Sequence, residues 1–294
     1  MYPYLNETDK KILELLYTYH FGWTQDIATM IDKRKSITYE RLTYLQEEAK
    51  YVQSKSLPGT RKKRVYGLTE DGFQFLKKQF GFNEQHIENR DTRFEMLSDG
   101  FIRHECLVLH VAARFFEAGK QGDFLVYDRR TILTHLTKEA RQMRTDERVK
   151  LLEVRPGPDG TETTHRADDF LIIKKPRERP RAVFVEIDRG TESLRDRNGK
   201  AKGKVSKMMR AYIEAYRSKF FRTYAGRDYK PLVLFVLETP YNASTRLQNF
   251  IDLWREIGAG EAEGLPRFIP LQEFDTIAIE EERFHGLDGL GSVV

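Results

Sequence analysis

Apolar residues recur at helical spacing near the N-terminus, at Ile12, Leu15, Leu16 and Tyr19. Asn6 precedes them, with acidic residues just after it, and asparagine is a preferred helix N-cap. The pattern predicts a helix from about residue 7 to 19. A polar break at 21–24 and a second amphipathic segment at 25–31 follow, and Ser36 is the predicted N-cap of a third helix.

The third helix is predicted to have an inner and an outer face. Thr38, Leu42, Leu45 and Ala49 share one side at helical spacing. The opposite side and its flanks carry Tyr39, Glu40, Arg41, Thr43, Tyr44 and Glu47. A polar outer face of this kind can enter the major groove of DNA.

A basic hairpin is predicted after the third helix. Its β-rich segments are 51–56 and 65–68, with a Leu-Pro-Gly-Thr turn at 57–60 between them. Four consecutive cations occupy 61–64, and an amphipathic helix at 69–80 follows. The chain therefore shows three helices, a basic hairpin and a fourth helix in that order.

This order resembles the winged helix-turn-helix domain over residues 6–80. The resemblance implies a recognition helix at 36–48 and a wing at 57–64. The groove candidates are then Ser36, Tyr39, Arg41, Thr43 and Tyr44. The phosphate-binding candidates are Lys33, Lys35, Arg61, Lys62, Lys63 and Arg64. A winged helix that binds protein is the alternative, and the basic wing argues against it.

The chain has 294 residues and a net charge of +5, but its positive charge lies in two blocks. Ten Lys and Arg face three Glu between residues 33 and 64, and twelve face three acidic residues between 195 and 230. Neutralising DNA phosphates releases condensed counterions, so such blocks favour binding to a nucleic acid. Solvated helix faces also collect lysines, which is the alternative for either block alone.

The pattern changes after a polar linker at 83–98. The predicted elements are a buried helix at 104–118, strands at 124–127, 151–154, 170–173 and 183–187, a basic helix at 204–219, a strand at 232–237, a helix at 243–257 and a strand at 267–269. This α/β order predicts a mixed sheet flanked by helices. The predicted domains are 1–82 and 99–285, with a flexible tail at 286–294.

Four acidic residues form the strongest candidate for chemistry. Glu186 and Asp188 are two apart, so they project from the same face of their strand. A neighbouring strand brings Asp168 or Asp169 alongside them. Three oxygen donors, Asp168, Glu186 and Asp188, suit Mg²⁺ or Mn²⁺, the cations with which a nuclease holds phosphate and activates water. An ion-pair cluster with nearby arginines is one alternative, and metal binding without turnover is another.

Three segments carry a second resemblance: Arg-Ala-Asp-Asp-Phe at 166–170, Glu-Ile-Asp-Arg-Gly-Thr-Glu-Ser at 186–193, and a Lys and a Tyr five apart at 207–212. They are similar to the replication-relaxation family, proteins of plasmids and other mobile elements that join a winged helix to a PD-(D/E)xK nuclease-like domain. The resemblance aligns Asp168 with the family's Arg-Pro-Asp aspartate, although Ala167 replaces the proline. It aligns Glu186 with the motif glutamate.

The resemblance departs from active PD-(D/E)xK enzymes at Asp188, where those enzymes usually carry a lysine. Such a cation stabilises charge that develops on phosphate during cleavage. Lys204 or Lys207, near the start of the following helix, can supply it from another position. The catalytic candidates are therefore Asp168, Asp169, Glu186, Asp188, Lys204 and Lys207.

Together these patterns predict a cytoplasmic, double-stranded DNA-binding protein with a domain that binds Mg²⁺ or Mn²⁺ and cleaves or nicks DNA. The family resemblance implies that it belongs to a plasmid or other mobile element and takes part in replication or relaxation. The alternative is a non-catalytic transcriptional regulator or relaxosome accessory factor whose second domain dimerises or contacts other replication or mobilisation proteins. Zinc, haem and nucleotide cofactors are not expected, since Cys106 is the only cysteine and the loop 195–204 lacks Walker spacing. No membrane span is expected, because the longest apolar run is 232–237.

Overall fold

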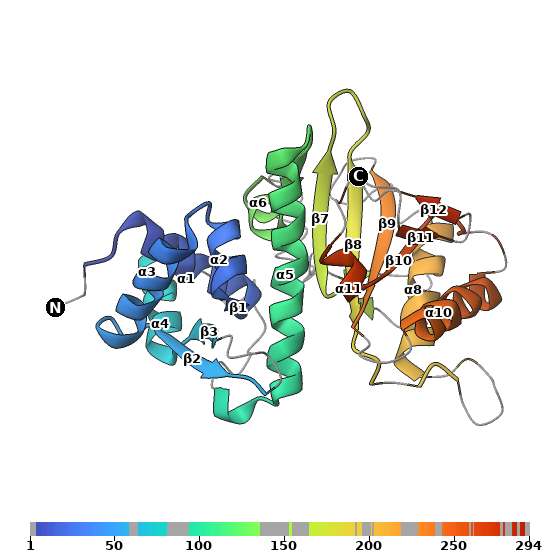
Figure 1. Cartoon of the computed structure of the whole chain (residues 1–294). Coiled ribbons are helices and arrows are strands. Elements are labelled where there is room, and N and C mark those ends of the chain that lie inside the picture. Colours follow the sequence, from blue (N-terminus) through green and yellow to red (C-terminus); the bar gives the residue numbers. More distant parts are fainter. Residues whose placement is uncertain are drawn as a thin grey trace. The chain divides into compact units, whose positions relative to one another are not determined.

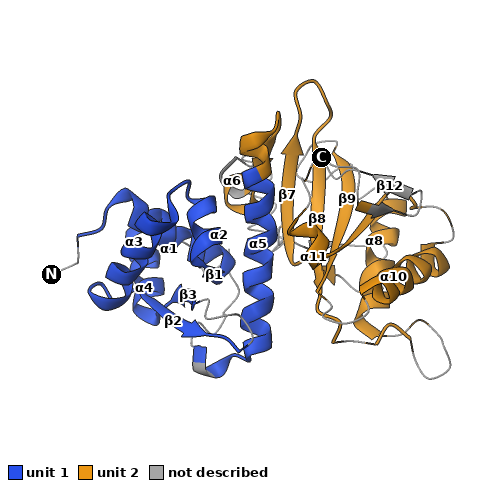
Figure 2. Ribbon diagram, in the orientation of Figure 1, with its two compact units in different colours: residues 1–117 blue, residues 118–294 orange. Residues whose placement is uncertain are grey.

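The computed structural model describes residues 4–58, 64–80, 94–135, 153–154, 165–191, 193–195, 201, 203–218, 229–238, 243–258, 260, 262–276, 279, 284–286 and 289–291. The chain divides into two compact units, residues 1–117 and 118–294 (Figure 2). This division falls later in the chain than the predicted linker at 83–98. The mixed helix and sheet content confirms the predicted α/β class.

The elements of the N-terminal unit follow the predicted order. They are α1 (Glu7–Tyr19), β1 (Phe21–Trp23), α2 (Thr24–Met30), α3 (Lys35–Glu47), β2 (Val52–Ser56), β3 (Arg64–Leu68), α4 (Glu70–Phe80), a 3₁₀ turn (Phe94–Met96) and most of α5 (Asp99–Gln121). Asn6 caps α1 as predicted, since its side chain accepts from the Asp9 N–H and Asp9 accepts from the Asn6 N–H. The N-cap of α3 is Arg34, so the prediction of Ser36 as cap is wrong by two residues.

The predicted hairpin is present, and a third strand joins it. The sheet order is β1-β3-β2, with Phe21 opposite Gly67. A Cβ at Gly67 would lie 2.6 Å from the Phe21 ring, so this close approach of β1 requires glycine. The sequence predicted a polar break where β1 lies, because three residues are too few to show a period of two. The basic residues Arg61, Lys62 and Lys63 lie outside the described residues.

The end of the predicted linker belongs to the core of the N-terminal unit. Phe94 is buried, and its ring centroid lies 5.0 Å from that of Phe21. Leu57 of the hairpin turn, Ile102 and Cys106 complete this cluster. The helix α5 begins at Asp99, five residues before the predicted start at 104. Phe94 and Leu97, within the predicted linker, therefore pack into the N-terminal unit.

The C-terminal unit contains a seven-stranded mixed sheet and its helices (Figure 1). Its elements are β4 (Leu125–Tyr127), α6 (Arg129–His135), β5 (Glu153–Val154), β6 (His165–Arg166), β7 (Asp169–Lys174), β8 (Arg181–Asp188), α8 (Gly203–Arg217), β9 (Lys230–Leu237), α10 (Ala243–Gly258), β10 (Pro266–Pro270), α11 (Leu271–Phe274), β11 (Phe284–Gly286) and β12 (Gly289–Gly291). The sheet order is β12-β11-β10-β9-β8-β7-β4, and β8, β9 and β10 are parallel. The strands β5 and β6 pair separately.

The core of this unit lies between the sheet and the helices α8 and α10. Phe184, Tyr212, Phe235, Trp254 and Phe268 are all fully buried there. The central strand β9 is apolar at almost every position, as expected for a parallel strand covered on both faces. At the chain's end, β12 pairs with β11. The predicted flexible tail at 286–294 is therefore wrong for residues 286 and 289–291.

Candidate functional site at the end of strand β8

Glu186 lies near the end of β8 and is almost completely buried, with 5% of its surface exposed. Its Oε1 atom is 2.7 Å from Nε2 of His165 on β6 and accepts a hydrogen bond of 2.5 Å from the Tyr212 hydroxyl on α8. The His165 and Tyr212 rings also meet edge to face. Glu186 is thus held by two elements that pack against its strand.

The charges around Glu186 shift two pKa values. Burial raises the pKa of the Glu186 carboxyl, the charge of His165 opposes this, and the carboxylate of Asp168 adds to the increase. Burial by itself would lower the pKa of His165, but the negative charges of Glu186 and Asp168 outweigh it and raise that pKa. This group of residues therefore holds protons more tightly than the same side chains in water.

Asp168 is the aspartate that lies beside Glu186. Its Oδ2 atom accepts a hydrogen bond of 2.8 Å from the Ile187 N–H, and its own N–H donates to the Val185 carbonyl. Its charge also contributes to the raised pKa values of Glu186 and His165. Of the two aspartates that the sequence left open, Asp168 thus belongs to the site.

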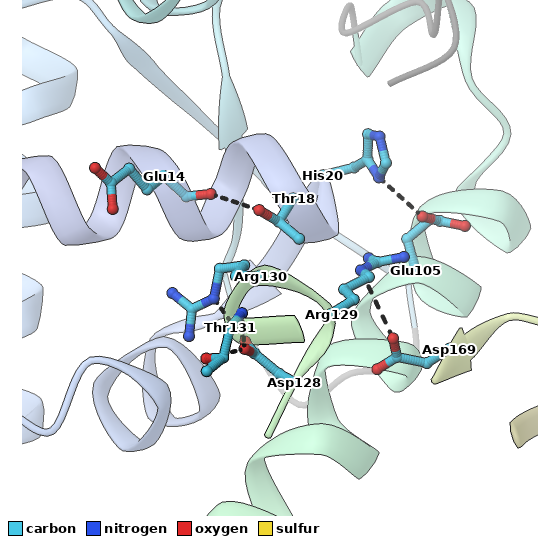
Figure 3. Close-up of polar contacts among 9 residues, drawn as sticks. All are labelled: Glu14, Thr18, His20, Glu105, Asp128, Arg129, Arg130, Thr131 and Asp169. Atoms are coloured by element: carbon cyan, nitrogen blue, oxygen red, sulfur yellow. Dashed lines mark hydrogen bonds and ion pairs between the residues drawn. The ribbon is translucent and has the colours of Figure 1, made fainter. Parts of the chain in front are cut away.

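Asp169 faces the other side of the sheet. It pairs with Val185 in the ladder, and the next residue, Phe170, packs with Phe184 on the Glu186 side. Its carboxylate is buried 3.6 Å from Nε of Arg129 (Figure 3). Asp128 fixes the start of α6 by accepting from the Thr131 N–H and hydroxyl, which places Arg129 there. The catalytic prediction for Asp169 finds no support in this geometry.

Asp188 is bound by an arginine that sequence reasoning missed. Its two carboxylate oxygens accept hydrogen bonds from Nε and Nη2 of Arg246 on α10, each 2.8 Å long. Both side chains are largely buried, with 10% of Asp188 and 15% of Arg246 exposed. No sequence spacing signals this pair, because 58 positions separate the two residues.

Each of the three predicted metal ligands already has a polar partner in this arrangement. Asp188 is neutralised by Arg246, Asp168 accepts from the backbone of Ile187, and Glu186 accepts from Tyr212 beside His165. Among the residues that the structure describes, no group of three or more His, Cys, Asp or Glu is placed to hold a metal ion. The geometry matches the predicted alternative of an ion-pair cluster.

The two predicted catalytic lysines lie on the outside of α8. Lys204 and Lys207 are exposed, whereas Tyr212 of the same helix is fully buried against Glu186. The Lys and Tyr five positions apart therefore divide between the two faces of the helix. The residue that α8 contributes to Glu186 is Tyr212, and catalysis by either lysine stays a prediction.

The predicted DNA-contacting residues of the N-terminal unit differ in exposure. Lys33, Lys35, Ser36, Tyr39 and Arg64 are exposed, and Thr43 and Tyr44 are half-buried. The Tyr44 hydroxyl donates to the Tyr4 carbonyl, and the Thr43 hydroxyl donates to the Tyr39 carbonyl.

Arg41 has an internal partner that sequence reasoning did not foresee. Its Nε and Nη2 atoms donate to the two carboxylate oxygens of fully buried Asp9, at 2.8 and 2.6 Å. Its guanidinium also lies over the Tyr44 ring. This pair joins α3 to α1, so Arg41 has a structural role inside the unit, and its groove contact stays a prediction.

Histidines join α5 to the rest of the N-terminal unit. Nδ1 of His20 lies 3.2 Å from Glu105, and Nδ1 of His110 lies 2.9 Å from Asp26 (Figure 3 shows the first pair). The helix α5 is therefore an integral part of this unit.

The two units and the cluster at the end of β8 define a protein with a helical N-terminal unit and an α/β C-terminal unit. The sequence profile of the replication-relaxation family matches residues 13–226. The chain belongs to the replication-relaxation family, whose name points to a role in replication or relaxation. No curated protein and no solved structure matches it significantly. In the described residues, no helix is long and apolar enough to cross a membrane.

Proposed function

We propose that the chain binds double-stranded DNA of a plasmid or another mobile element through its N-terminal unit, which acts as a winged helix. The observation that carries the proposal is the exposed, basic start of α3. Lys33, Arg34 and Lys35 are exposed there, and no side chain caps the helix at Arg34. Uncapped N–H groups and cations together favour a phosphate.

The outer face of α3 suits a groove next to that phosphate. Tyr39 is 51% exposed and Ile37 is 41% exposed, so both side chains are available for contact with a partner. The inner residues Thr38, Leu42 and Leu45 are fully buried, as the sequence predicted. Their burial keeps the opposite face of α3 turned toward solvent. The basic segment predicted for the wing, 61–64, adds further phosphate contacts in this proposal.

The test compares single charge reversals in the full chain by fluorescence anisotropy with a labelled duplex. Lys35→Glu is expected to weaken binding and to reduce the salt slope by about one unit, since one phosphate contact contributes roughly 0.9. Lys78→Glu is the matched control, because Lys78 is exposed on α4 and bears the same charge. Equal effects of both variants would show that α3 does not contact DNA.

We further propose that the C-terminal unit supports this function without cleaving DNA, as a regulator or accessory factor. The observation that favours this role is the bidentate pair in which Arg246 binds both carboxylate oxygens of Asp188, a predicted metal ligand. Dimerisation and contacts with other replication proteins remain predictions of this role.

A nicking assay on supercoiled plasmid with Mg²⁺ or Mn²⁺ tests the absence of cleavage. The Glu186→Gln variant removes the buried carboxylate charge and keeps the shape of the side chain. Wild type is expected to nick no faster than this variant. Cation-dependent nicking by wild type that Glu186→Gln abolishes would overturn the proposal and restore the predicted nuclease site.

A further inference from the structure

The solvent face of α8 carries a row of cations that the proposed function does not use. Lys204, Lys207, Arg210 and Arg217 are all exposed on this helix. At about 100° per residue, Lys207, Arg210 and Arg217 fall within roughly 80° of the helix circumference. The buried face, which includes Met209, Tyr212 and Ile213, lies on the other side.

The acidic residue on this face does not cancel the row. Glu214 accepts a hydrogen bond of 2.6 Å from Arg217, so its charge is shared with the last cation of the row. Within the described part of the chain, Lys207 and Arg210 form no ion pair. Lys207 and Arg210 therefore present positive charge to solvent, and the acidic residue nearest to them on this face, Glu214, is already paired with Arg217.

The helix α10, which packs beside α8, shows that this charge is specific to α8 (Figure 1). The exposed face of α10 is charge-balanced: Arg255 lies near Asp252, and Glu256 pairs with Arg195. Its other exposed residues include Ser244, Thr245, Gln248 and Asn249. The two helices cover the same face of the sheet, but the positive charge gathers on one of them.

We propose that the solvent face of α8, comprising Lys204, Lys207, Arg210 and Arg217, is a second DNA-binding surface that contacts the phosphate backbone of duplex DNA. From Lys204 to Arg217 the helix extends about 20 Å, and duplex DNA presents a charge every 1.7 Å or so over that length. Several phosphates thus lie within reach of the row. The surface belongs to the C-terminal unit and does not depend on binding by α3.

The chemistry of this face favours DNA over an acidic protein. Protein interfaces have aromatic or apolar residues at their centre and few lysines. The row on α8 has no apolar residue between its cations on the exposed side, and the exposed ring of Tyr216 lies about half a turn away from Lys207. A surface with four cations and one paired carboxylate suits a repeating anionic backbone, which a protein contacts without reading bases.

The experiment measures duplex binding by the full chain across a salt series, with EDTA present so that no divalent cation contributes. Lys207→Glu/Arg210→Glu is expected to weaken binding at least about tenfold near 0.1 M salt and to reduce the salt slope by about two units. Lys207→Gln/Arg210→Gln removes the same two contacts, so a similar loss of salt slope is expected, with a smaller loss of affinity because no repulsive charge is added. The second variant keeps the test valid if charge reversal disturbs the fold, which circular dichroism reports.

The matched control is Lys174→Glu/Arg255→Glu, which changes the net charge of the same unit equally at exposed positions on β7 and α10. It is expected to bind within about twofold of wild type, because a distant charge is screened beyond roughly 10 Å. Equal losses in both double variants would mean that net charge alone matters and would overturn the proposal. An unchanged α8 variant would also overturn it and would point to an acidic protein partner.

The Lys35→Glu variant separates this inference from the proposed function. If Lys35→Glu binds normally while the α8 variant is weakened, the α3 proposal fails and the α8 surface stands. If the reverse holds, the α8 surface fails alone. In the combined variant, additive losses of salt slope are expected when both surfaces contact DNA.

Discussion

The pair between Asp188 and Arg246 decides whether the end of β8 is an ion-pair cluster or a metal site. Replacing Arg246 by methionine removes the guanidinium and keeps an unbranched side chain over the Phe250 ring, on which the arginine lies. Asp188 would then keep a hydrogen bond from the Gly190 N–H, but no neutralising partner in contact with its oxygens. A largely buried carboxylate without its cation is expected to destabilise the unit.

The size of the effect follows from burial. Removing one member of a buried ion pair costs about 3–5 kcal/mol, and the partial exposure of both side chains reduces this to about 2–4 kcal/mol here. Asp188→Asn/Arg246→Met removes both charges and is expected to cost less than Arg246→Met alone. The coupling in this double-mutant cycle is expected to be about 2 kcal/mol, or roughly a thirtyfold change in the unfolding equilibrium constant.

Urea unfolding followed by tryptophan fluorescence measures this cycle. Of the two tryptophans, Trp254 is fully buried in the C-terminal unit, so a Trp23→Phe background reports that unit selectively. The titrations are carried out with EDTA and repeated with excess Mg²⁺. A ligand that binds the folded state raises its stability, so bound Mg²⁺ would be visible directly.

One combination of results would contradict the assignment of Asp188 to an ion pair. If Arg246→Met is as stable as wild type, and Mg²⁺ stabilises wild type but not Asp188→Asn, then Asp188 is a metal ligand. The arginine would in that case be a replaceable neighbour, and the original metal prediction would be correct.

Two further predictions concern buried charges. Arg41→Met is expected to destabilise the N-terminal unit by about 2–4 kcal/mol, because it leaves buried Asp9 without a cation; Trp23 fluorescence during urea unfolding measures this. Weaker DNA binding by Arg41→Met at unchanged stability would instead return Arg41 to the groove. The raised pKa of His165 means that the folded state favours the protonated imidazole. The protonated imidazole therefore contributes its full stabilisation below pH 6.5, the ordinary pKa of histidine, and this stabilisation is lost as pH rises through the raised pKa. Wild type is therefore expected to lose stability above pH 6.5 in a urea series, and a His165→Gln variant that shows the same loss would contradict this assignment.

Local patterns predicted the elements whose residues repeat with a clear period. Helix α1 begins and ends where Asn6 and the apolar spacing place it, and strands β7, β8 and β9 lie within a residue or two of their predicted bounds. The short strands β1 and β12 escaped prediction, because each has three residues and no measurable period, whereas the equally short β4 lies in a predicted apolar run. The start of α3 was misplaced because serine suits a cap chemically, whereas Arg34 takes the cap position by its backbone conformation alone.

In the site at the end of β8, local sequence determined the direction of the side chains and long-range packing determined their partners. Alternation along β8 places Glu186 and Asp188 on one face, and antiparallel pairing with β7 brings Asp168 to the same end of the strand. The partners of these residues were decided by tertiary structure: His165 reaches Glu186 from β6, and Arg246 reaches Asp188 from α10. Sequence periodicity reports which way a side chain points, because that depends on its neighbours in the chain. Which charge it meets depends on how distant segments pack, and that packing determines whether a carboxylate can accept a metal ion or is already neutralised.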